Sequence, residues 1–128
     1  MTARRTMFAN AGFTAASAVF IFAARDWLYP LFGLQSAALL TVIAGGLLVY
    51  AGVLVVVARR EPPDRRALLT AAALDAGWVA GSAIVLIAAW TQLAPAARTL
   101  IIAAALIVEV FATLQFRLAR STAAGAGR

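Results

Sequence analysis

The sequence predicts an all-α protein, a four-helix transmembrane bundle. Of its 128 residues, 64% are hydrophobic and only 12% are charged, which is far less charge than a soluble domain of this size carries. The apolar residues form four long runs, and a helix needs about 20 such residues to cross a bilayer. Arginines flank these runs. We therefore expect one membrane domain, residues 1–120, followed by a small, polar and disordered tail, residues 121–128.

The four expected spans cover about residues 7–24, 36–58, 67–91 and 99–118. Backbone groups in hydrocarbon must be hydrogen-bonded within their own segment, so each span should be a helix. We expect the first span to end at Arg25-Asp26 and to be stopped by Pro30. Trp27 lies at the end of the first span and Trp90 at the end of the third, positions typical of a membrane interface.

The arginines predict how the chain lies in the membrane. Nine fall at the N-terminus, in the second loop or at the C-terminus, and two fall in the other loops, Arg25 and Arg98. The nine are Arg4, Arg5, Arg59, Arg60, Arg65, Arg66, Arg117, Arg120 and Arg128. Cytoplasmic loops carry the excess of basic residues, so both termini are expected in the cytoplasm. This distribution explains the net charge of +6 without a nucleic-acid partner.

The residue types exclude several kinds of chemistry. The chain contains no histidine, no cysteine and no lysine. His-ligated haem, zinc fingers, iron–sulfur clusters and disulfides therefore cannot form within it. The sequence also lacks a phosphate-binding loop and a nucleophile elbow. We expect no cofactor and no metal, and any acid–base chemistry must come from Asp, Glu, Tyr or Arg.

An internal repeat occurs at an offset of 65 residues. Residues 10–30 align without gaps with residues 75–95, and nine of the 21 positions are identical, including a glycine, a serine and a proline. Both segments start on the same side of the membrane, so the chain reads as two parallel two-helix repeats related by an axis along the membrane normal. Asn10 and Asp75 are then equivalent positions, and ligand sites in such proteins often lie between the repeats.

Two carboxylates, Asp75 and Glu109, lie inside apolar runs. A charge there costs at least about 2.5 kcal/mol on insertion scales and is rarely kept without a function. Both lie roughly 12–14 Å from the cytoplasmic ends of their spans, so we expect them to face the interior in one layer. Asn10 should hydrogen-bond to one of them. No arginine lies at that depth, so we expect at least one proton there at neutral pH unless a cationic ligand binds.

Other candidate ligand- or proton-binding residues share a helix face with Asn10 or Asp75. They are Ser17, Trp78 and Ser82. Interhelical hydrogen bonding or core packing is the competing interpretation for these residues. On the opposite face lie Gly77 and Gly81, repeated as Gly12 and Ala16, and small residues at this spacing predict close helix packing.

The sequence resembles a family of small four-helix bacterial inner-membrane proteins that usually have no assigned function. The resemblance covers nearly the whole chain and rests on Asn10 with Gly12 and Phe13, Tyr29-Pro30 to Gly33-Leu34, Asp75-x-x-Trp78-Val79-x-x-Ser82, and Glu109 to Gln115. It implies a topology but no activity. The small multidrug transporters also have four spans and one membrane carboxylate, but theirs lies in the first span, where this chain has Asn10.

Three classes of function are compatible with these features. The favoured one is binding or proton-linked transport of a small cationic or amphipathic ligand at the intramembrane carboxylates. The alternative is a non-catalytic scaffold or accessory subunit of a membrane complex, whose polar residues fix helix register and oligomeric state. The third is a membrane enzyme with Asp75 and Glu109 as acid and base. Expected partners are the lipid bilayer and either a second copy of the chain or a larger membrane complex.

Overall fold

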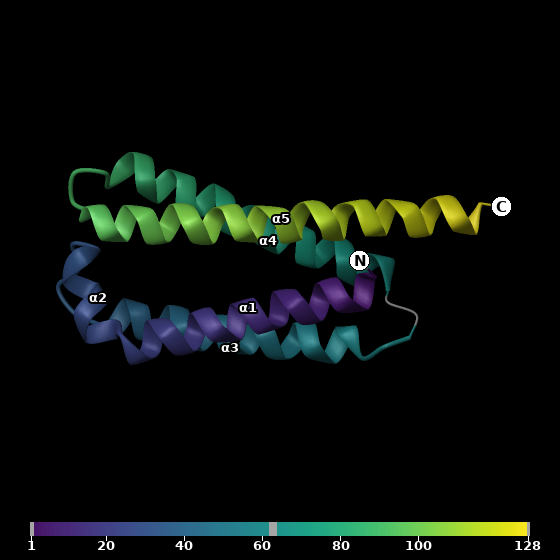
Figure 1. The fold of residues 1–128 in the computed structure, drawn as a ribbon, viewed down its shortest axis with the longest axis horizontal. Coiled ribbons are helices and arrows are strands. Elements are labelled where there is room, and N and C mark those ends of the chain that lie inside the picture. Colours follow the sequence, from purple (N-terminus) through teal and green to yellow (C-terminus); the bar gives the residue numbers. More distant parts are fainter. Residues whose placement is uncertain (1, 62–63, 128) are drawn as a thin grey trace.

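The computed structural model describes residues 2–61 and 64–127, and every regular element in them is a helix (Figure 1). The long helices are α1 (Ala3–Ala23), α3 (Ala38–Ala58), α4 (Arg65–Ala88) and α5 (Pro95–Ala126), and the short α2 (Arg25–Leu31) lies between α1 and α3. All four long helices are long and apolar enough to cross a membrane. The prediction of an all-α chain with four such helices is confirmed.

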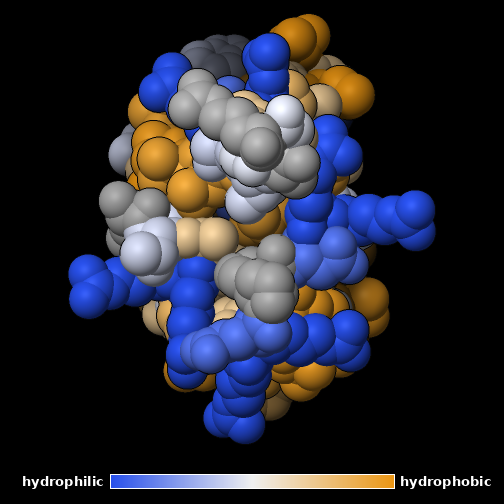
Figure 2. All heavy atoms as spheres, turned by 90° about the vertical axis from the view of Figure 1, so that its right-hand side faces the viewer, coloured by the Kyte–Doolittle hydropathy of each residue, from blue (hydrophilic) through white to orange (hydrophobic). Residues whose placement is uncertain are grey.

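The outer surface of the long helices is apolar. Large hydrophobic side chains are exposed along them, with Val42 at 71% and Ile87 at 83% exposure. A continuous apolar surface of this kind is suited to contact with lipid, where the backbone groups of a helix need no water. Both chain ends lie at one end of the bundle (Figure 1), and hydrophilic side chains gather there beside the apolar flanks (Figure 2).

Local sequence explains where the helices begin. The hydroxyl of Thr2 accepts a hydrogen bond from the N–H of Arg5 at 3.2 Å, before the first turn of α1. The carboxylate of Asp64 accepts one from the N–H of Arg66 at 3.0 Å, before α4. Such caps satisfy N–H groups that the first turn of a helix leaves unpaired. α5 begins with Pro95, whose missing N–H costs nothing at the first helical position.

The first span ends within one residue of the predicted boundary, but Pro30 does not stop it. α1 ends at Ala23, before Pro30, and Pro30 lies inside α2. The guanidinium of Arg25 donates a hydrogen bond to the carbonyl oxygen of Phe22 at 2.7 Å. This contact satisfies one of the last carbonyl groups of α1 and explains why the helix can end there, ahead of the proline.

The tail also differs from the prediction. Residues 121–126 continue α5 and are not disordered, whereas Arg128 lies outside the described residues. The hydroxyls of Ser121 and Thr122 donate to the carbonyl oxygens of Leu118 and Ala119, both at 2.8 Å. These two side chains therefore bond back to the helix, and the alanines beside them favour helical structure.

The four long helices form two pairs. α1 lies along α3 and α4 lies along α5, and the pairs meet through α1 and α5 (Figure 1). Near the chain ends an apolar core joins them, formed by Met7, Ala11, Leu54, Ala58, Leu68, Ala71 and Ala119. At the opposite end the N–H of Ala94 donates to the carbonyl oxygen of Leu31 at 2.8 Å. The two pairs are thus connected at both ends.

Gly33 ends α2 in the left-handed region, with φ of +68°. The N–H of Gly33 bonds to the carbonyl of Pro30 at 3.1 Å and the N–H of Leu34 to that of Tyr29 at 3.0 Å, the pattern of a glycine helix cap. A Cβ atom at position 33 would lie 2.9 Å from the backbone oxygen of Gln92. Glycine is therefore required here both for its conformation and for the close approach of the two loops.

We expect Gly33→Ala to lower the free energy of unfolding by about 1–3 kcal/mol, because a left-handed alanine is strained and its Cβ would push the two loops apart. Thermal unfolding in detergent measures the change. Gly12→Ala is the matched control, since nothing lies within 4 Å of an added Cβ there. The control should be neutral or slightly stabilising. Equal losses in both variants would contradict this account of Gly33.

The small-residue faces do not pack against other helices of this chain. Gly12, Gly77 and Gly81 are exposed, and an added Cβ at any of them would meet nothing within 4 Å. The prediction of helix packing there is wrong within the chain. The buried side of α4 carries Leu68 and Asp75, and Gly77 lies about 180° around the helix from Leu68.

Candidate functional site

Asp75 lies at the centre of a buried polar cluster between the two helix pairs. The side chain comes from α4 and is 4% exposed. Its Oδ2 accepts a hydrogen bond from Nδ2 of Asn10 on α1 at 2.7 Å, and its Oδ1 accepts one from the hydroxyl of Tyr50 on α3 at 3.0 Å. Both donors come from the other helix pair. Asp75 therefore links the two pairs, and both its oxygens accept hydrogen bonds from neutral groups.

Asn10 is held in place by its own helix. It is 1% exposed, and its Oδ1 accepts a hydrogen bond from the hydroxyl of Thr14, one turn later on α1, at 3.2 Å. This bond fixes the amide so that its nitrogen points to Asp75. The predicted hydrogen bond between Asn10 and an intramembrane carboxylate is present. Asn10 and Asp75 are 65 residues apart, the offset of the sequence repeat.

No cationic side chain of the described residues pairs with Asp75. The ion pair found in residues 2–61 and 64–127 joins Arg4 and Glu61, at the end that carries the chain termini. A buried carboxylate without a cationic partner keeps much of the cost of its burial, which neutral hydrogen bonds reduce only in part. The site is therefore suited to accept a positive charge or a proton.

An apolar groove leads away from Asp75 between the two helix pairs. Its first part has a volume of about 420 Å³ and is lined by Asp75, Tyr50, Phe13 and Trp78, among others. A second part of about 320 Å³ shares Phe13 and Trp78 with the first and continues towards Leu28 and Phe32. Apart from Asp75 and a few hydroxyl groups the lining is aliphatic or aromatic. Small-molecule sites have this composition, with many apolar contacts and few polar ones.

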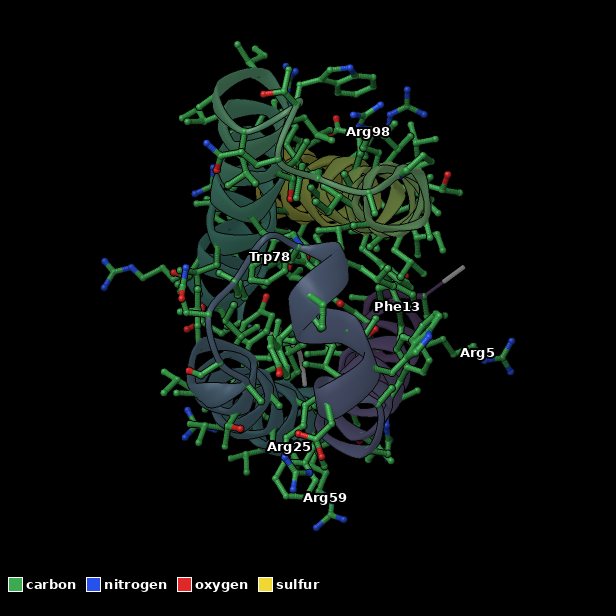
Figure 3. The ribbon with its side chains drawn as sticks, turned by 90° about the vertical axis from the view of Figure 1, so that its left-hand side faces the viewer. Arg5, Phe13, Arg25, Arg59, Trp78 and Arg98 are labelled. Atoms are coloured by element: carbon green, nitrogen blue, oxygen red, sulfur yellow. The ribbon has the colours of Figure 1, made fainter. Side chains whose placement is uncertain are left out.

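Two aromatic side chains form the middle of the groove. Figure 3 shows Phe13 and Trp78 between the two helix pairs, with Arg5, Arg25 and Arg59 directed outwards. Trp78 is 39% exposed, so neighbouring side chains do not cover it completely. The ring of Phe13 lies 6.1 Å, centroid to centroid, from that of Phe111 on α5. The two rings lining the groove, which lie on opposite helix pairs, can flank a bound cation.

Ser17 and Ser82 line the groove further from Asp75. Ser17 belongs to both parts of the groove and Ser82 to the second part. The hydroxyl of Ser82 donates to the carbonyl of Trp78 on its own helix at 2.9 Å. Neither serine joins the polar cluster. The structure thus brings Ser17, Trp78 and Ser82 to the groove beside Asp75, as candidates for contact with one ligand. Asn10 contacts Asp75 itself but does not line the groove.

Glu109 does not lie in this space, so the expectation that it faces the interior beside Asp75 is wrong. Its side chain is exposed and lines a different hollow between α4 and α5, together with Arg117 and Arg120. The buried side of α5 carries Val108, Ala112, Gln115 and Ala119, and position 109 points about 90° away from it. Because the two carboxylates face different surfaces, Asp75 and Glu109 do not form a pair in this structure.

Two residues of the cluster were not among the candidates. Tyr50 is half-buried on α3 and reaches Asp75 with its hydroxyl. Gln115 on α5 is 0% exposed and lies beside Asp75. A signal for Gln115 was present, since it shares a helix face with the small residues Ala112 and Ala119. Tyr50 has no polar neighbour on its own helix face, and only the packing of the two helix pairs brings its hydroxyl to Asp75.

The site is made of oxygen and amide groups. Within the described residues no group of three or more His, Cys, Asp or Glu side chains could hold a metal ion. The arrangement can bind one positive charge, hold one proton and make aromatic and aliphatic contacts. Comparison with protein-family models, curated proteins and solved structures found no match to this chain.

Proposed function

We propose that this protein binds a lipophilic monovalent cation in the groove between its helix pairs, with Asp75 as the counter-ion, and that binding is linked to proton exchange across the membrane. The observation that carries the proposal is a buried carboxylate at the end of an apolar, aromatic groove, with no cationic partner among residues 2–61 and 64–127. The single charge of Asp75 matches a monocation, and the lining matches a hydrophobic body.

Charge–charge and cation–π attraction favour a cation over a neutral ligand. Attraction between unit charges is several times stronger at a partly buried site than in water. The faces of Trp78 and Phe13 add cation–π attraction, which is worth more where water is excluded. A neutral ligand would gain only the apolar contacts and would leave Asp75 without a counter-charge. The ligand class is therefore amphipathic, with an apolar body along the groove and its charge at Asp75.

Proton exchange follows from having one carboxylate. Asp75 can neutralise one positive charge, either a proton or the ligand, but not both at once. A ligand arriving at a protonated Asp75 must displace that proton, and a proton arriving at the complex weakens ligand binding. This mutual exclusion is the thermodynamic basis for coupling the movement of one to that of the other.

The test of this function uses tetraphenylphosphonium, a lipophilic monocation, and the purified protein in lipid nanodiscs. Saturable binding of one cation per chain, competing with protons, supports the proposal. Binding that rises linearly with concentration, as for partition into lipid alone, contradicts it.

We further propose that both termini lie in the cytoplasm of a bacterium and that the chain spans its inner membrane. The support is the position of the arginines in the sequence: nine of the eleven fall near the N-terminus, between the second and third spans or near the C-terminus. At the other end Arg25 and Arg98 contact Phe22 and Trp90, with their guanidinium carbons 4.3 and 4.2 Å from the ring centroids.

The orientation has a direct test. Reporter fusions after Glu61 should report a cytoplasmic position, whereas fusions after Gln35 and after Gln92 should report the opposite side. The expected result follows from the excess of basic residues at the end that contains Glu61. Fusions after Leu118, on the same end as Glu61, serve as the control. A reversed pattern at either Gln35 or Gln92 would contradict the orientation.

An origin by duplication is also part of the proposal, and backbone hydrogen bonds support it. The N–H of Ala24 bonds to the carbonyl of Phe20 and that of Ala89 to Val85, both at 2.9 Å. These two ends of α1 and α4 are 65 residues apart, like Asn10 and Asp75. A pseudo-twofold axis between Asn10 and Asp75 would place the cation site at the interface of the repeats.

One observation favours a second candidate, an accessory subunit or homo-oligomer. Glu109, Gly77 and Gly81 are exposed on surfaces that would face lipid in a monomer. An intramembrane carboxylate exposed to lipid is costly, and small residues allow close approach of another helix. Chemical cross-linking in native membranes distinguishes this candidate from the cation-binding function. A discrete complex that is lost in Glu109→Leu supports the accessory subunit or homo-oligomer. A monomer that binds the cation supports the cation-binding function.

A further inference from the structure

Protein closes the groove at both ends of the bundle. On the side of the chain termini the apolar core begins beside Asp75, since it includes Ala71, whose carbonyl oxygen lies 3.4 Å from the hydroxyl of Tyr50. At the opposite end α2 lies across the bundle (Figure 3), and its Leu28 is buried. The hydrogen bond from the N–H of Ala94 to α2 holds this end together. Protein therefore lies between the groove and the water at both ends.

The sides of the groove are exposed instead. In the first part of the groove the exposed lining residues are Gly46 on α3 and Leu74 and Trp78 on α4. In the second part they include Phe20 on α1 and Ile107 on α5. α3 packs along α1 and α4 packs along α5, so the first part is open between α3 and α4. These positions on α3 and α4 lie in the middle turns of helices long enough to cross a bilayer, so the surface outside them faces hydrocarbon.

We propose that the ligand enters and leaves the groove from the bilayer, and that the opening between α3 and α4, formed by Gly46, Leu74 and Trp78, is its route to Asp75. This inference rests on the proposed function and specifies its ligand class. The ligand is a cation that dissolves in the membrane before it binds, and it is not taken up directly from water.

The chemistry of the groove fits a ligand that arrives from lipid. The apolar body of such a ligand is already in contact with hydrocarbon, so moving into an apolar groove gains little from the hydrophobic effect. What the groove adds to the lipid environment is the carboxylate of Asp75 and the faces of two aromatic rings. The site therefore selects among membrane-dissolved molecules by their charge.

The first test fills the opening. A Cβ atom added at Gly46 would meet nothing within 4 Å, so a phenyl ring can stand in the opening without displacing the backbone. Gly46→Phe should slow both association and dissociation of tetraphenylphosphonium at least about tenfold, because the ring obstructs the route while Asp75 stays in place. The two rates are measured by rapid filtration of protein in lipid nanodiscs.

Gly45→Phe is the matched control for this test. Gly45 is exposed on the next residue of α3, but it does not line the groove. Both rates of the control should stay within about twofold of wild type. Rates in Gly46→Phe that match those of wild type, or equal slowing in both variants, would overturn the route.

The second test needs no ligand and no change in the groove. The chain has three tryptophans, so Trp27→Phe combined with Trp90→Phe leaves the fluorescence of Trp78 alone. Phosphatidylcholine with brominated acyl chains should quench this fluorescence strongly, and acrylamide in the water should quench it weakly. The control keeps only Trp90, which is exposed just beyond the end of α4 and should be quenched by acrylamide.

Strong quenching of Trp78 by acrylamide, without quenching by the brominated lipid, would indicate a groove reached from water and overturn the inference. The proposed function fails separately. If the brominated lipid quenches Trp78 but wild type does not bind tetraphenylphosphonium, the cation-binding function is contradicted and the opening to the bilayer stands. If wild type binds the cation but only acrylamide reaches Trp78, the function stands and the route from the bilayer is wrong.

Discussion

Asp75→Leu is expected to lower the free energy of unfolding by about 2–4 kcal/mol, because Nδ2 of Asn10 and the hydroxyl of Tyr50 both lose their acceptor. Each donor would remain between the helix pairs with no replacement. Asp75→Asn keeps one acceptor oxygen and should lose about 1 kcal/mol or less. Each variant in detergent solution is unfolded by titration with a denaturing detergent, and the free energy of unfolding is measured from that titration.

The matched control for this prediction is Glu109→Leu. Glu109 is also an intramembrane carboxylate, but among the described residues its side chain accepts a hydrogen bond only from Thr113 on its own helix, at 3.5 Å. Its replacement should not destabilise the protein. If Asp75→Leu were as stable as wild type, Asp75 would not connect the helix pairs in the way that its hydrogen bonds imply.

Asp75→Asn is expected to weaken binding of tetraphenylphosphonium at least about 30-fold, which corresponds to about 2 kcal/mol, the lower range for removing one partner of a buried charge pair. The phosphonium has no hydrogen-bond donor, so its interaction with Asp75 is electrostatic, and a neutral amide cannot replace it. Binding is measured by equilibrium dialysis of protein in lipid nanodiscs.

Glu109→Gln is the control for this experiment, since it removes the other intramembrane carboxylate while leaving the groove intact. Its affinity should stay within about twofold of wild type, as expected for a charge outside the site. An affinity of Asp75→Asn equal to that of wild type would remove Asp75 from the binding site. A loss in Glu109→Gln alone would move the site to the hollow between α4 and α5.

The fold could be predicted because hydropathy and length determine which segments cross a bilayer. The helix ends could be predicted less well, because they depend on single contacts. α1 ends at Ala23, where the guanidinium of Arg25 donates to the carbonyl oxygen of Phe22. α5 continues through Ser121 and Thr122, because their hydroxyls donate to carbonyl oxygens of the same helix. Such local hydrogen bonds do not change the hydropathy of a segment.

The site could be predicted in part. The repeat in the sequence indicated that Asn10 and Asp75 would meet, and they do. Depth alone placed Glu109 beside Asp75, but depth does not determine the direction of a side chain around its helix. The buried face of α5 carries Gln115 with the small residues Ala112 and Ala119, and it leaves Glu109 outside. Tyr50 also belongs to the cluster, but it lies on α3, whose sequence shows no polar stripe that would have indicated it.

The central claim is that Asp75 and the groove beside it hold a lipophilic cation. A structure of the protein with bound tetraphenylphosphonium tests it most directly. We predict the phosphonium in the groove beside Asp75, within about 6 Å of the ring centre of Trp78. Density for the cation beside Glu109 in the hollow between α4 and α5, or only among the surrounding lipid, would contradict the claim.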